Sequence, residues 1–183
     1  MHVRRVVTGH RPDGTATVVA DGAAPRSHDF AEIAGMSETL VWVTEAGAPI
    51  TVGGGDPTPT AADLPAPGGT RFAVVRFPPD AVYADPAFDG AAALAEQQRV
   101  APGLAARFEP DAPGMHTTDS VDYAIVLEGE IWLELDDDEL VHLARGDVVV
   151  QNGTRHAWRN RSNEPATLAF VNVGAELPAR RGS

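Results

Sequence analysis

Two stretches in the second half of the chain decide its fold: residues 116–129, HTTDSVDYAIVLEG, and residues 146–160, GDVVVQNGTRHAWRN. Both alternate polar with apolar residues and contain turn-forming glycine or asparagine, which is typical of short β-strands joined by tight turns. Neighbouring apolar runs extend the pattern with hardly any helix signal. Strands are predicted at residues 120–127, 130–135, 140–144, 147–151, 154–160 and 166–174. This regular spacing predicts a sandwich or closed barrel from residue 114 to residue 174.

Alternation also predicts which side chains point into this barrel. One inward face carries, in order, His116, Thr118, Ser120, Asp122, Ala124 and Val126, because residues two apart share a face of an extended segment. A second face carries His156 and Trp158. If the two segments are neighbours, two imidazoles and one carboxylate converge. Two histidines and one carboxylate form a facial triad, which leaves positions open on a divalent metal.

The same residues resemble the cupin superfamily, in its small single-barrel "cupin 2" type. Its first motif has the form G-x5-H-x-H-x3,4-E-x6-G; here His116 stands at the first His, Asp122 at the Glu and Gly129 at the last Gly. The second motif, G-x5-P-x-G-x2-H-x3-N, resembles residues 146–160, with one residue fewer and Asn in place of Pro. Thr118 stands where the family has its second His, so one of four expected ligands is missing.

The resemblance implies an all-β fold, a cupin-type double-stranded β-helix or jelly-roll barrel with an N-terminal β extension and one short helix. It implies that His116, Asp122 and His156 bind one divalent ion (Fe, Zn, Mn or Ni) and form the catalytic centre. The predicted substrate pocket consists of Thr118, Ser120, Ala124, Val126 and Trp158. A homodimer is also expected, because cupins commonly pair through exposed strand edges.

These features predict a metal-dependent enzyme that acts on a small organic molecule, with non-haem Fe(II) dioxygenase chemistry preferred because the triad matches its ligand set. A redox-neutral lyase, isomerase or cyclase remains open. So does a metal-free cupin that binds a small molecule or uses a histidine as a base. Asp122 has a further alternative, an ion pair with Arg155 or Arg159.

The rest of the chain is predicted to belong to the same domain, residues 1–183. Residues 1–80 should supply N-terminal strands and a long loop at residues 46–70, rich in Gly and Pro. Residues 85–100 should form a helix that acts as a lid, with Asp85 as its N-cap. Residues 114–174 are the barrel core. The expected N-terminal strands are at residues 2–8, 15–20, 40–45 and 71–77.

Composition excludes several other functions. The chain has no Cys, and its 14 basic residues are all Arg, so thiolate and Schiff-base chemistry are absent. A net charge of −12 disfavours nucleic acid, and no apolar run suits a membrane or a signal peptide, so a cytoplasmic protein is expected. His142 is predicted to lie on the surface. His10 and His28, in N-terminal loops, are minor candidates for a missing ligand.

Overall fold

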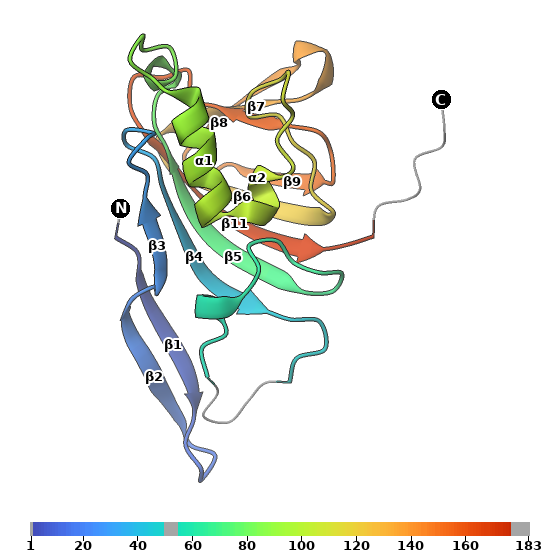
Figure 1. The fold of residues 1–183 in the computed structure, drawn as a ribbon. Helices are drawn as coiled ribbons and strands as arrows, with labels where there is room; N and C mark the ends of the chain where they lie inside the picture. The colour runs from blue at the N-terminus through green and yellow to red at the C-terminus, as the bar shows by residue number, and fades with distance from the viewer. Residues whose placement is uncertain (1, 50–54, 177–183) are drawn as a thin grey trace.

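The computed structural model describes residues 2–49 and 55–176 (Figure 1). Its strands are β1 (Arg4–His10), β2 (Ala16–Ala23), β3 (Arg26–Asp29), β4 (Ser37–Thr44), β5 (Thr70–Phe77), β6 (Ser120–Glu128), β7 (Glu130–Glu134), β8 (Leu140–Ala144), β9 (Val148–Asn152), β10 (Ala157–Arg159) and β11 (Ala166–Gly174). Its helices are α1 (Gly90–Val100) and α2 (Pro102–Ala105), with short 3-10 turns at Thr58–Thr60, Asp80–Val82 and Asp136–Asp138. Among the described residues, no helix is long and apolar enough to cross a membrane.

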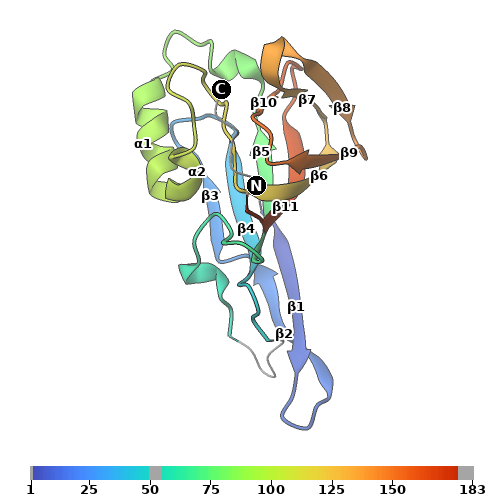
Figure 2. The same cartoon turned by 90° about the vertical axis from the view of Figure 1, so that its right-hand side faces the viewer.

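Antiparallel strands build the domain. The main sheet has the order β3-β4-β5-β11-β6-β9, and a smaller sheet has the order β10-β7-β8. Inward side chains of both sheets form a shared core, as the alternating pattern predicts: Ala124, Val126, Ile131, Leu133, Leu143, Ala166 and Leu168. The strands β1 and β2 form a separate hairpin that projects away from the barrel (Figures 1 and 2). The predicted all-β jelly-roll barrel with an N-terminal β extension is confirmed.

The N-terminal third differs in detail from the sequence prediction. The hairpin and the strands near residues 40 and 71 are present, but β4 begins at Ser37, and β3 was not predicted. The β3 segment, RSHD, is short and polar, so it has no apolar alternation; it is a strand because it pairs with β4 at the edge of the sheet. In the predicted loop at residues 46–70, residues 50–54 lie outside the described part of the chain.

Both helices lie on one side of the main sheet (Figure 2). The helix α1 starts five residues later than predicted, because Asp89 is its N-cap and accepts hydrogen bonds from the backbone N–H groups of Ala91 and Ala92. Asp85 instead bonds the N–H of Ala87 in the preceding turn. Pro102 opens the second helix α2, since proline suits a first helical turn.

A buried carboxylate anchors α1 to the loop after β3. Glu96 accepts hydrogen bonds from the backbone N–H groups of Ala31 and Glu32 and contacts His28 Nε2 at 2.8 Å. Burial alone raises the pKa of Glu96, but these hydrogen bonds outweigh it and lower the pKa to about 2. The ionised side chain therefore holds the helix against the sheet.

We expect Glu96→Gln to destabilise the protein at neutral pH by about 1–3 kcal/mol, since an amide oxygen replaces both carboxylate oxygens as acceptors. The pKa of Glu96 in the folded protein lies below its ordinary value of 4.5. The extra stability of wild type over Glu96→Gln is therefore complete above pH 4.5 and shrinks as the pH falls to about 2. Urea unfolding across this range measures it. Glu32→Gln, at an exposed position, is the control. A difference between wild type and Glu96→Gln that does not change with pH would contradict this assignment.

Two motif glycines test the turn geometry of the barrel. Both have positive φ angles, 75° at Gly129 and 94° at Gly146. A Cβ added at Gly129 would lie 2.6 Å from the Pro165 carbonyl oxygen, whereas a Cβ added at Gly146 would have no neighbouring atom within 4 Å. Gly146→Ala should cost about 1 kcal/mol for the backbone conformation. Gly129→Ala should cost about 1–3 kcal/mol more because of the collision. Equal losses in urea unfolding would refute this difference.

Candidate functional site

Two histidines from distant parts of the chain meet at the barrel mouth. The backbone N–H and carbonyl groups of His116 and His156 exchange two hydrogen bonds of 3.0 Å, forming an isolated antiparallel bridge. A bridge of this kind places both side chains on one face. Their ring centroids are 4.3 Å apart, and Phe108 packs edge-on against His116. The sequence prediction that these imidazoles converge is thus confirmed.

Backbone carbonyls select the tautomer of each imidazole. His116 Nδ1 lies 3.0 Å from the Gly114 carbonyl oxygen, and His156 Nδ1 lies 3.0 Å from the Thr154 carbonyl oxygen. A carbonyl oxygen only accepts, so each Nδ1 must carry the proton and donate it. In the neutral ring, Nε2 then keeps its lone pair. Histidines that bind metals are oriented by the same kind of contact.

Burial keeps both rings neutral. It lowers the pKa of His116, and burial together with the neighbouring His116 lowers the pKa of His156 to about 4. A charged imidazole is disfavoured in this apolar surrounding, and two cationic rings so close together would repel each other. At neutral pH, the pair therefore presents two Nε2 lone pairs.

Asp122 contributes a carboxylate from β6. Its side chain is 5% exposed; Oδ2 accepts a 3.3 Å hydrogen bond from Thr118 Oγ1, which in turn accepts one from Ser120 Oγ at 3.0 Å. Asp122 Oδ1 is buried and has no hydrogen-bond partner among the described residues. An unmatched carboxylate oxygen is costly inside a protein. Its surroundings therefore have a place for a further donor or a cation.

A cavity of about 960 Å³ connects these groups, bounded by the main sheet, the helices and the segment before β6. At its polar end it is lined by His116, Thr118, Asp122, Gln151, His156 and Asn172. Its remaining walls are mostly apolar and include Leu40, Ala73, Phe77, Phe88, Phe108, Trp158 and Phe170. This volume suits a drug-sized organic molecule.

The predicted pocket residues are only partly in this cavity. Thr118, Ala124 and Trp158 line it, as expected. Ser120 lies behind Thr118 and lines a smaller surface pocket, and Val126 packs in the core between the sheets. The inward face is therefore divided between the cavity and the packed interior.

Metal binding by His116, Asp122 and His156 stays a prediction. Within residues 2–49 and 55–176, no three or more His, Asp or Glu side chains are close enough together to hold a metal ion. Asp122 has a side chain one methylene shorter than the Glu of the motif, and Thr118 has no imidazole. The paired histidines are the donors that the fold brings into direct contact.

The alternative ion pairs predicted for Asp122 are not formed. Arg155 instead bonds Glu109 and Asp136, and Arg159 bonds Glu134. Both arginines are therefore engaged by carboxylates other than Asp122.

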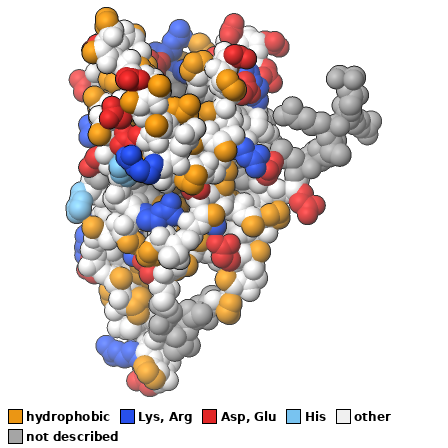
Figure 3. All heavy atoms as spheres, viewed as in Figure 1, with side chains coloured by type: hydrophobic (Ala, Val, Ile, Leu, Met, Phe, Trp, Pro, Cys, Tyr) orange, Lys and Arg blue, Asp and Glu red, His pale blue; other side chains and the backbone are white. Residues whose placement is uncertain are grey.

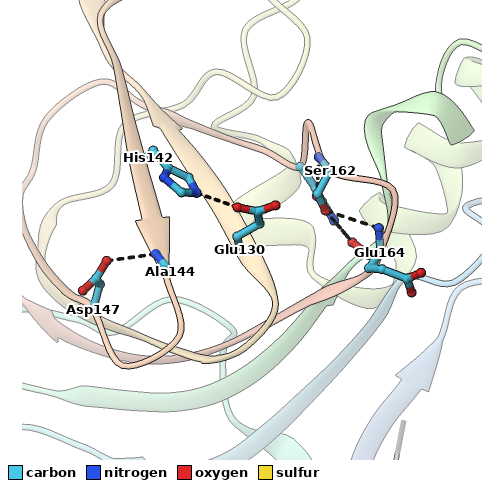
Figure 4. Close-up of polar contacts among 7 residues, drawn as sticks. Glu130, His142, Ala144, Asp147, Ser162 and Glu164 are labelled. Carbon is cyan, nitrogen blue, oxygen red and sulfur yellow. Dashed lines mark hydrogen bonds and ion pairs between the residues drawn. The ribbon is translucent and has the colours of Figure 1, made fainter.

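The remaining predicted histidines lie away from the site. His142 is exposed on β8 and contacts Glu130 Oε2 at 2.7 Å, as Figure 4 shows, which confirms its surface position. His10 and His28 lie in strands and not in the predicted loops: His10 is the last residue of β1, and His28 lies in β3, where Glu96 contacts it. Neither supplies the missing ligand within the described structure.

Two cavity residues were missed by sequence reasoning. Gln151 of β9 pairs with Asp122 of β6, and its Nε2 is buried without a hydrogen-bond partner among the described residues. Glu38 of β4 lines the cavity, and burial, followed by the nearby Asp63, raises its pKa. Gln151 is two residues from Val149 on β9, so both side chains share one face of the strand, and this spacing would have placed Gln151 inward. Glu38 lay in a segment without recognisable periodicity, so the sequence offered no such signal for it.

Residues 96–173 match the family model of the cupin domain (Cupin_2). The chain is 52% identical over 63 residues to Phomopsin biosynthesis cluster protein C' of Diaporthe leptostromiformis, covering 34% of this chain and 33% of that protein. It is 48% identical over 46 residues to Cupin-domain-containing oxidoreductase virC of Hypocrea virens, covering 25% and 24%. It is 36% identical over 76 residues to Cupin-domain-containing oxidoreductase fogC of Aspergillus ruber, covering 38% and 37%. The matches span between about a quarter and about a third of the length of these relatives.

Solved cupin structures are also similar to this chain. A Cupin 2 conserved barrel domain protein from Salinispora arenicola has a TM-score of 0.38 and 20% identity, covering 65% of this chain and 71% of that one. A cupin superfamily protein from Desulfitobacterium hafniense has a TM-score of 0.42 and 10% identity, covering 80% and 84%. The motif residues and the family match together identify a cupin domain of the cupin 2 type at residues 96–173.

Proposed function

We propose that this protein is a metal-dependent cupin oxidoreductase that acts on a small, mostly apolar organic molecule bound in the cavity. The observation that carries this proposal is the histidine pair. Each ring of His116 and His156 donates Nδ1–H to a backbone carbonyl and keeps a free Nε2 at the polar end of the cavity. This arrangement prepares both rings as neutral ligands or bases.

The types of donor suit a divalent transition metal, although in the described residues the two imidazoles and the Asp122 carboxylate are not grouped closely enough to hold one. Neutral imidazole nitrogens suit iron, zinc and nickel, and the buried Asp122 Oδ1 has no partner among the described residues. His116 and His156 would hold the ion as a pair, with Asp122 as the third ligand. When bound, Fe(II) would supply positions for dioxygen and substrate, whereas Zn(II), Mn(II) or Ni(II) would supply a Lewis acid.

The protein's own groups set the environment of the reaction. The backbone bridge fixes the spacing of the two imidazoles, and the Thr118 hydroxyl orients Asp122 by donating to Oδ2. Aromatic walls exclude water from the substrate, which strengthens polar contacts at the reacting end. Phe108, edge-on to His116, covers the same end.

The names of two relatives favour oxidation over redox-neutral chemistry, since both virC and fogC are called oxidoreductases. A two-His, one-carboxylate set is also the ligand set of non-haem Fe(II) oxygenases. Both points support an Fe(II) dioxygenase as the finer form of the proposal. A lyase, isomerase or cyclase is the alternative if the bound metal is not iron.

A second candidate is a metal-free cupin that binds its ligand or uses a histidine as a base. It is favoured by Thr118, which replaces a ligand of the motif and bonds Asp122. Such a protein would keep its ligand affinity or activity when a chelator is present.

A homodimer is part of the proposal. On the outer face of the main sheet, Tyr123 pairs with Val150 and Ile125 pairs with Val148, and all four side chains are exposed. They lie at the edge strand β9, so a second copy of the chain, related by a two-fold axis, would cover them with the same apolar surface. Figure 3, by contrast, shows charges of both signs among the hydrophobic side chains on the viewed face.

The first prediction concerns metal content. Purified wild type should bind about one equivalent of Fe(II). His116→Ala and His156→Ala should each weaken metal binding by at least about 10- to 100-fold, because changing a residue that merely orients a metal ligand already costs this much affinity. Asp122→Asn should weaken it in the same direction. Elemental analysis and metal titration measure this, with His142→Ala as the surface control. Iron in natively expressed protein supports the oxygenase; zinc or nickel supports the Lewis-acid alternative. No metal in the wild type retires the metal proposal.

The second prediction concerns assembly. Val148→Arg should convert the dimer to a monomer, because it places a charge within the apolar outer face. Light scattering after size-exclusion chromatography measures the mass. Val141→Arg is the matched control, since Val141 is also exposed but lies on β8 of the other sheet. A monomeric wild type, or two variants with equal effect, would refute the assigned surface.

A further inference from the structure

Gln151 is a buried amide at the polar end of the cavity whose oxygen accepts a hydrogen bond but whose nitrogen has no partner among the described residues. Its side chain is 4% exposed and faces inward from β9, beside Asp122 of β6. Thr154 Oγ1 donates a 2.9 Å hydrogen bond to Gln151 Oε1. Nε2 has no hydrogen-bond partner among the described residues. Leaving such a donor unmatched costs about 1–3 kcal/mol, so its position calls for an acceptor.

The chemistry of the free group limits what this acceptor is. An amide N–H cannot bind a metal cation, so the metal proposed for the histidine pair leaves it unsatisfied. The opposite orientation of the Gln151 side-chain amide would exchange its two ends. The oxygen would then stand where Nε2 is now, and the N–H₂ group would point toward Thr154. The adjacent Asp122 carboxylate favours the orientation that presents the N–H₂ group to the cavity.

The polar groups near Gln151 lie in one row across the sheet. Arg71 pairs with Asn172, Asn172 with Asp122, and Asp122 with Gln151 in successive strands. Arg71 is engaged by Glu45 and by the carbonyl oxygens of Ala62 and Thr70. The next row along the strands is apolar, with Ala73, Phe170 and Ala124 in register. On these four strands a ligand would therefore meet polar side chains in the row with Gln151 and apolar side chains in the next row, while Glu38 of β4 lines a separate part of the cavity.

Aromatic side chains form the walls beyond this row. Phe77, Trp158 and Phe170 pack against one another with ring centroids 5.5 to 6.5 Å apart. All three line the cavity. A molecule that fills this space exposes mostly carbon to rings and presents its polar atom to the row with Gln151.

We propose that Gln151 is a substrate-binding residue that donates a hydrogen bond to an oxygen of the substrate, and that the substrate is a largely apolar molecule with a carbonyl-type oxygen at one end. This inference rests on the proposed function for its reaction, but its binding site does not require the metal. Through this hydrogen bond, Gln151 orients the substrate relative to His116 and His156.

A pair of matched probes tests this inference. 2-Acetylnaphthalene has a carbonyl oxygen that 2-ethylnaphthalene lacks, and the two are otherwise alike in size. Equilibrium binding is followed by quenching of tryptophan fluorescence, since Trp158 lines the cavity, and is confirmed by calorimetry. Wild type should bind the ketone more tightly. Gln151→Leu should weaken ketone binding about 3- to 10-fold, the value of one neutral hydrogen bond, and change ethyl-probe binding less than about twofold.

Controls separate this role from others. Gln151→Glu, which presents acceptor oxygens, should also lose the preference for the ketone, whereas Asn152→Ala, at an exposed amide one residue on, should retain it. Thermal unfolding of each variant establishes that it is folded. Metal content of Gln151→Leu should equal that of wild type.

Several outcomes would overturn the inference. Wild type that binds neither probe, or both equally, has no such subsite. Equal weakening of both probes by Gln151→Leu shows a packing effect. Loss of metal from Gln151→Leu shows that Gln151 orients Asp122 and does not contact substrate. If instead wild type holds no metal but shows a ketone preference that depends on Gln151, the subsite stands and the metal proposal fails.

Discussion

The central strand β11 is the constraint on which the rest of the domain depends. It pairs with β5 on one side and with β6 on the other, each over eight positions in register. Through it, the N-terminal strands are joined to the segment that carries Asp122. Because antiparallel pairing fixes which side chains share a face, the register of β11 decides which residues of four strands meet in the cavity.

The pairing of β11 with its neighbours also explains why the polar groups of the site are buried beside apolar side chains. On β5, β11, β6 and β9, the polar residues that line the cavity occupy one row, and apolar residues occupy the next row. Burial in this environment keeps the two imidazoles neutral, as their lowered pKa values show. The backbone carbonyls that hold each Nδ1 would help a charged ring, but the cost of desolvation is larger. The result is a pair of unprotonated Nε2 atoms at the polar end of the cavity.

The cavity extends well beyond the motif residues. Residues of α1 and α2 line it, and both helices lie on one side of the main sheet (Figure 2). Glu96 ties α1 to the loop after β3. The lining of the cavity is thus divided. The motif segments supply His116, Asp122 and His156, and the N-terminal strands with the helices supply much of the remaining wall.

The sequence by itself determined the barrel, its strands from residue 114 onward, and the inward direction of His116, Asp122 and His156, because a period of two leaves little freedom in an extended chain. Only the tertiary structure decided which partners these side chains have. Arg155 and Arg159 were equally plausible partners of Asp122 in the sequence, yet Glu109 and Glu134 bind them. Gln151 resembled an ordinary strand residue until the pairing with Asp122 placed its free donor in the cavity. Contacts between strands that are distant in sequence depend on register and sheet order, which local periodicity does not encode.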